Sequence, residues 1–151
     1  IRLGITFSTP EISLLLNSMK YPYNISNLTS DIALRATTPE ALKKTESKIA
    51  SIIEQRQYVL EKLMSLKQVG RNIGGLDSNF ILLEILDKNG SPNNEIAYKV
   101  YMKLASERKV VVRFRGKELG CNGCLRVTIG IKEENERLIQ EFESVLNEVV
   151  V

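Results

Sequence analysis

Two arginines near the C-terminus have the type and the spacing to bind an anion. Arg113 lies in the run V-V-V-R-F-R, and Arg126 lies in the run C-L-R-V-T-I-G. A guanidinium group matches carboxylate or phosphate because its N–H donors form a planar fork. In both runs apolar residues alternate with the others, as on a strand whose successive side chains point to opposite faces. Each arginine is therefore predicted to lie on the polar face of a strand.

A linker with three glycines, residues 116–123, connects the two predicted strands. Such a linker can reverse the chain and pair the strands antiparallel. Pairing about the middle of the linker places Arg113 opposite Arg126. Like charges facing each other across a sheet are unfavourable, so a bound anion is one explanation of this pattern. The alternative is that each arginine pairs with an acidic side chain or extends into water.

Composition limits the classes of protein to consider. The 151 residues suit one modest domain, and 43% apolar with 26% charged residues is typical of a soluble globular protein. We expect no membrane segment, no secretory signal and a cytoplasmic location. The net charge of +3 is too small to indicate nucleic acid by itself. The chain has no histidine, which excludes histidine-based catalysis and histidine–metal ligation within it.

Two further motifs favour structural roles. Cys121 and Cys124 form a C-x-x-C, but the chain has no second pair or histidine to complete a zinc site. We expect a turn with one buried cysteine and no metal. The glycines of residues 70–75 lack the lysine of a phosphate-binding loop, so we interpret this segment as a flexible connection.

Hydrophobic periodicity and capping signals predict alternating helices and strands after residue 38. The fold class is therefore α/β, with a small sheet covered by helices mainly on one face. Helices are predicted over residues 10–19, 27–36, 39–66, 96–104 and 132–149, and strands over residues 80–86, 110–115 and 124–131.

Several segments resemble the fold-type I pyridoxal-phosphate aminotransferases, class II. Arg2-Leu3-Gly4 resembles the end of the family's lysine motif, and Pro22-Tyr23-Asn24 resembles the segment that leads into the small domain. Ser78-Asn79-Phe80-Ile81-Leu82 and Cys124-Leu125-Arg126-Val127-Thr128-Ile129-Gly130, then Glu133-Glu134-Asn135, are similar to the members that act on histidinol phosphate. The resemblance covers essentially the whole chain.

This resemblance implies roles for three arginines. Arg2 matches the arginine that holds the phosphate of the cofactor, pyridoxal 5'-phosphate. Arg126 matches the arginine that binds the acidic group of the substrate, and Arg113 matches a second arginine that helps to hold the substrate phosphate. The implied substrates are histidinol phosphate and glutamate or 2-oxoglutarate, in histidine biosynthesis, and the implied assembly is a homodimer without nucleic acid or membrane.

The resemblance also implies a division of the chain. Residues 1–36 correspond to the end of the cofactor-binding domain and a crossing segment, and residues 37–151 correspond to the small C-terminal α/β domain. The Schiff-base lysine belongs upstream of Arg2, so this chain has no catalytic residue of its own. We expect the isolated chain to be inactive and to bind no cofactor covalently. The alternatives are another aminotransferase, for aromatic or other amino acids, and a non-enzymatic module that binds anions or nucleic acid.

Overall fold

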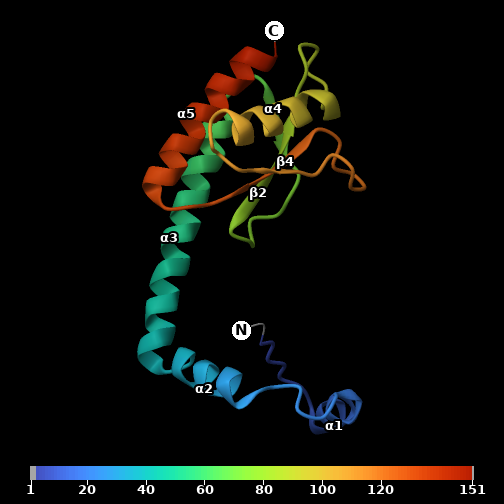
Figure 1. Ribbon diagram of the computed structural model, residues 1–151, viewed down its shortest axis with the longest axis vertical. Coiled ribbons are helices and arrows are strands. Elements are labelled where there is room, and N and C mark those ends of the chain that lie inside the picture. Colours follow the sequence, from blue (N-terminus) through green and yellow to red (C-terminus); the bar gives the residue numbers. More distant parts are fainter. Residues whose placement is uncertain (1–2, 151) are drawn as a thin grey trace. The chain divides into compact units, whose positions relative to one another are not determined.

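The computed structural model describes residues 3–150 and divides the chain into two compact units, Ile1–Lys48 and Ile49–Val151. Figure 1 shows the elements of both units. The long helix α3, Pro39–Met64, continues across the boundary between them. No helix within the described part of the chain is long and apolar enough to cross a membrane.

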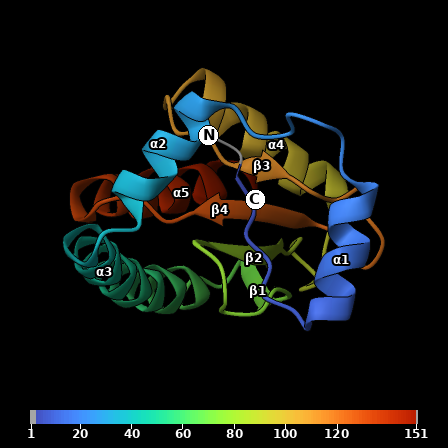
Figure 2. The same cartoon turned by 90° about the horizontal axis from the view of Figure 1, so that it is seen from below.

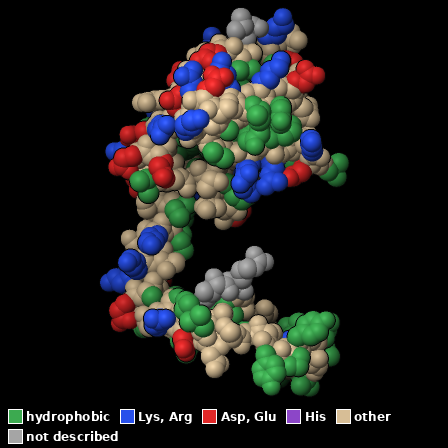
Figure 3. All heavy atoms as spheres, viewed as in Figure 1, with side chains coloured by type: hydrophobic (Ala, Val, Ile, Leu, Met, Phe, Trp, Pro, Cys, Tyr) green, Lys and Arg blue, Asp and Glu red, His purple; other side chains and the backbone are tan. Residues whose placement is uncertain are grey.

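The first unit contains two short helices with little core of their own. Helix α1 is Pro10–Met19, and its proline occupies the first turn, where a missing N–H costs nothing. Helix α2 is Asn27–Ala36, and the backbone N–H of Thr29 donates to the capping Ser26 Oγ at 3.1 Å. Neither helix buries a residue. Hydrophobic side chains gather over the surface of α1, as Figure 3 shows.

The second unit is built on a four-stranded antiparallel sheet in the order β1-β2-β4-β3. Figure 2 shows β4 between β2 and β3. Within the sheet, Arg126 of β4 has Leu82 of β2 on one side and Arg113 of β3 on the other. The strands are β1, Val69–Asn72; β2, Phe80–Ile85; β3, Arg113–Phe114; and β4, Cys124–Thr128.

One face of this sheet carries the hydrophobic core. Helix α4 is Asn94–Ser106, helix α5 is Lys132–Val149, and the two helices pack against each other. Alternate residues of β2 and β4 are fully buried with side chains of α3, α4 and α5, as their period of two requires. The core includes Val59, Leu63, Ile81, Leu83, Ile85, Val100, Leu104, Leu125, Val127, Phe142 and Leu146.

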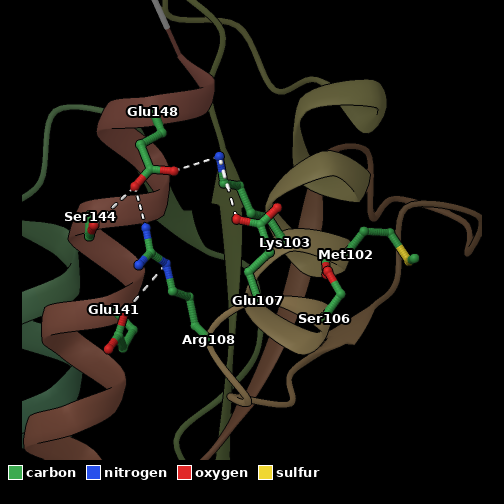
Figure 4. Close-up of polar contacts among 8 residues, drawn as sticks. All are labelled: Met102, Lys103, Ser106, Glu107, Arg108, Glu141, Ser144 and Glu148. Atoms are coloured by element: carbon green, nitrogen blue, oxygen red, sulfur yellow. Dashed lines mark hydrogen bonds and ion pairs between the residues drawn. The ribbon is translucent and has the colours of Figure 1, made fainter.

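Ion pairs join α4 and the residues after it to α5 on the outside of this core (Figure 4). Lys103 Nζ lies 2.5 Å from Glu148 Oε2, and Arg108 pairs with both Glu148 and Glu141. The hydrogen bond from Lys103 lowers the pKa of the Glu148 carboxyl. Because these groups lie near the surface, the pairs contribute modestly to stability.

Three expectations about strands are wrong. Residues 69–72, which overlap the segment 70–75 expected to be a flexible connection, form the edge strand β1. Strand β3 has two residues and not six, because Val110 N–H donates to the carbonyl oxygen of Leu104 and continues the end of α4. Strand β4 ends at Thr128, and Ile131 is not on the apolar face; it precedes α5 and is 63% exposed.

Candidate functional site

Arg113 and Arg126 are directly opposite each other in β3 and β4, which confirms the expected antiparallel register. Directly opposite residues of an antiparallel pair project from the same face of the sheet. That face is opposite to the core, since Val112, Leu125 and Val127 are buried on the other side. Arg126 is half-buried, and Arg113, on the edge strand, is exposed. The linker that joins the strands has left-handed backbone at Gly120 and Gly123, with φ of 75° and 70°.

Among residues 3–150, the two arginines differ from their neighbours in having no hydrogen-bond or ion-pair partner. Within residues 3–150, no hydrogen bond or ion pair is made by either guanidinium group, and the Nε of Arg126 is buried without an acceptor. The other arginines of the second unit are all engaged. Arg56 donates to Ser78 O, Arg71 pairs with Glu84, Arg108 with Glu141 and Glu148, Arg115 with Glu118, and Arg137 donates to Arg108 O.

A surface pocket opens beside this pair of arginines. Its lining contains four basic side chains and no acidic one, so an anion entering it meets a positive potential, although Arg115 is already paired with Glu118. The lining residues are Tyr98 and Tyr101 from α4, Arg113 and Phe114 from β3, Arg115 and Lys117 from the linker, and Arg126 from β4. The arrangement therefore fits a carboxylate or a phosphate group.

Aromatic rings support the site from two sides. The rings of Tyr98 and Phe114 meet edge to face with centroids 5.5 Å apart, which fixes β3 against α4. On the open face of the sheet, the guanidinium carbon of Arg126 lies 5.1 Å from the centroid of the Phe80 ring. This distance is within the range of a cation–π contact.

A buried asparagine fixes the end of the strand that carries Arg126. The Asn135 side chain is 1% exposed and accepts from Gly130 N at 2.9 Å. It donates to Gly130 O and to Gln55 Oε1, both at 3.0 Å. One amide of α5 thereby satisfies both backbone groups of Gly130 and ties the corner after β4 to α3.

The cysteine pair confirms the expected turn with one buried residue. Cys124 is fully buried and Cys121 is partly exposed. Burial raises the pKa of the Cys124 thiol to about 11, with a smaller contribution from Cys121, so the thiol stays protonated at neutral pH. A protonated thiol is a poor nucleophile and a poor metal ligand. Around this pair, as elsewhere in residues 3–150, no three metal-binding side chains cluster.

The structure brings together two of the three arginines singled out from the sequence. Arg2 lies outside the described residues. Tyr98 and Tyr101 also line the pocket but were missed, because nothing in the sequence indicates that α4 packs beside β3. Phe80 was missed as well, although it lies within a segment that carries the family resemblance. The available signal was the alternation of β2, because Phe80 and the charged Glu84 are four residues apart and therefore lie on the same face of the strand, away from the core.

Sequence comparison identifies the family. A family model for aminotransferase class I and II matches residues 1–142, and the chain belongs to this family. It is 58% identical over 149 residues to a histidinol-phosphate aminotransferase of Candida maltosa and 48% identical over 147 residues to one of Saccharomyces cerevisiae. These alignments cover 99% and 97% of the chain but 38% and 37% of the relatives, so the chain spans under two fifths of their length.

A solved structure shows the same fold. The histidinol-phosphate aminotransferase of Sinorhizobium meliloti, in complex with pyridoxal-5'-phosphate, superposes with a TM-score of 0.73 at 16% identity. The match covers 93% of this chain and 35% of that one. The expected architecture, the small-domain α/β fold of the pyridoxal-phosphate aminotransferases with helices mainly on one face of a small sheet, is therefore confirmed.

Proposed function

We propose that this chain is the C-terminal part of a histidinol-phosphate aminotransferase. The reaction transfers an amino group from glutamate to imidazole acetol phosphate and yields 2-oxoglutarate and histidinol phosphate. The names of the Candida and Saccharomyces relatives support this activity. The observation in this chain that carries it is the pair of facing arginines, which have no hydrogen-bond or ion-pair partner within residues 3–150, since both reaction partners present an anionic group at the end of the molecule.

The two arginines have different proposed roles. Arg126, half-buried and central, would bind the carboxylate of glutamate in one half-reaction and the phosphate of histidinol phosphate in the other. One fork serves both because guanidinium matches either anion. Arg113, on the exposed edge strand, would add a second contact to the larger phosphate. Together they would hold the substrate so that its amino group is oriented for reaction, which is a large part of catalytic rate.

The proposed cofactor is pyridoxal 5'-phosphate. When bound, it supplies the electron sink that stabilises a substrate carbanion. The donor set around Arg126 fits the anionic group of a substrate, and the described residues bring no lysine of the family's Schiff-base motif to it. We assign that lysine to the part of the whole protein upstream of this chain and the cofactor phosphate to Arg2. Residues 1–36 would then complete the cofactor-binding domain, and residues 37–151 would form the small domain.

The family resemblance further supports a homodimer in the cytoplasm with small-molecule substrates. Transamination assays on the full-length protein test the proposed activity. Histidinol phosphate and phenylalanine compete in them as amino donors to 2-oxoglutarate. A preference for histidinol phosphate is expected. A preference for phenylalanine would assign the protein to the aromatic aminotransferases, and no transfer from either donor would favour a non-enzymatic anion-binding module. The isolated 151-residue chain should catalyse no transfer.

A further inference from the structure

We infer that Phe80 is a positioning residue for Arg126 and orients its guanidinium through the face of the aromatic ring. The inference rests on the proposed function, since it concerns how the substrate-binding arginine is held. Phe80 lies in β2 opposite Thr128 of β4, and Arg126 lies opposite Leu82. Phe80 and Arg126 are therefore diagonal neighbours on the open face of the sheet, a distance that an aromatic side chain can span.

Among the described residues, the cation–π contact with Phe80 is the one electrostatic contact that holds this guanidinium group. Its carbon lies 5.1 Å from the ring centroid, and its Nε is buried without an acceptor. The negative face of an aromatic ring attracts a cation, and arginine is the cation that most often uses this contact. The Nε–H finds no acceptor, so the ring face is the contact through which the described residues hold this cation in place.

Contrast with Arg71 shows what the ring achieves. Arg71 gives both Nε and Nη2 to the carboxylate of Glu84, at 3.1 and 2.8 Å, so its fork is saturated by the protein. An acid in the same place beside Arg126 would compete with every substrate anion. A ring fixes the direction of the guanidinium plane but accepts none of its in-plane hydrogen bonds, so the charged fork stays free for the ligand. Phe80 thereby preorganises Arg126 without competing with the substrate anion for its N–H donors.

The test is a fluorination series at position 80 of the full-length holoenzyme. Fluorine withdraws electron density from the ring face and leaves the shape of the side chain nearly unchanged. Phenylalanine, monofluoro-, difluoro- and trifluorophenylalanine are compared by single-turnover rates with glutamate and with histidinol phosphate, and by the dissociation constant of glutarate. The single-turnover rates and the affinity for glutarate should fall stepwise with each added fluorine, by about three- to thirtyfold across the series. The fall should be equal in both half-reactions because Arg126 serves both.

Two substitutions and one control complete the design. Phe80→Tyr keeps the ring face and should stay within about twofold of wild type, whereas Phe80→Leu removes it and should match the trifluoro variant. Unchanged rates and glutarate affinity across the fluorinated series would overturn the inference, and so would a Phe80→Leu variant equal to wild type. Arg126→Ala separates this inference from the proposed function. If that variant keeps both half-reactions, the substrate site is wrong; if it loses them while the series stays flat, only the role of Phe80 is wrong.

Discussion

Arg113 and Arg126 face each other across β3 and β4, and no acidic side chain within residues 3–150 forms an ion pair with either. Two like charges in this position oppose the pairing of the strands unless something neutralises them. The neighbouring Arg115 shows that the protein can neutralise a guanidinium here, because Glu118 lies 2.6 Å from it. The free pair therefore does not reflect a shortage of acidic residues, and we propose that it binds an anion.

Removal of the Asn135 amide should destabilise the second unit. Asn135→Ala leaves the N–H and carbonyl of Gly130 and the Oε1 of Gln55 without their partner, in a part-buried corner. The free energy of unfolding of the 151-residue chain should fall by about 2–3 kcal/mol, as measured by urea titration. Asn122→Ala is the matched control: its amide is exposed and donates one bond, to Pro92 O, so its loss should stay below about 1 kcal/mol. Equal effects of the two variants would contradict the role of Asn135.

The Glu84 carboxylate should make the free energy of unfolding fall at acidic pH. It accepts from the backbone and side chain of Arg71, and the side-chain hydrogen bond lowers its pKa below the ordinary value of 4.5. A depressed folded-state pKa means that the carboxylate stabilises the fold above pH 4.5 and that this contribution is lost as the pH falls through the lower folded value. Glu84→Gln should therefore lower the free energy of unfolding at pH 7. The difference in this free energy between the variant and wild type should become smaller towards pH 3. Urea titrations at the two pH values check this, and a constant difference would contradict it.

Arg2 should act on the cofactor and not on substrate choice. In the full-length enzyme, Arg2→Ala removes a proposed charge-assisted contact to the cofactor phosphate, which is worth about 1.5–3 kcal/mol. Cofactor occupancy after dialysis should drop, while the preference for histidinol phosphate over phenylalanine should stay unchanged. Full occupancy after extended dialysis, measured by the absorbance of the bound cofactor, would argue against this role.

The sequence predicted those parts of the fold that depend on local signals. Helices α1 and α5 begin and end where hydrophobic periodicity places them. The opposition of Arg113 and Arg126 was also predictable, because one short linker sets the register of the two strands. Strand β1 was missed because Val69-Gly70-Arg71-Asn72 has one β-favouring residue, and pairing with β2 overrides this weak propensity.

The remainder of the site depends on contacts between distant segments. Phe80 approaches Arg126 only because β2 pairs with β4 across the intervening residues 86–123, and no turn sets that register. The same holds for Tyr98 and Tyr101, which reach the pocket through the packing of α4 beside β3. A single sequence carries no local signal for these placements, since they follow from the packing of the whole unit.

Single-turnover kinetics of the two half-reactions, on Arg126→Ala and Arg113→Ala in the full-length enzyme, test the substrate site most directly. Arg126→Ala should slow the reactions with glutamate and with histidinol phosphate alike, by about thirtyfold in kcat/KM, which corresponds to ~2 kcal/mol for one charge-assisted contact. Arg113→Ala should slow histidinol phosphate to a similar extent and glutamate far less, because only the phosphate uses the second arginine. Equal slowing of both substrates by Arg113→Ala, or wild-type rates in Arg126→Ala, would contradict the assignment of this pair as the anion-binding site.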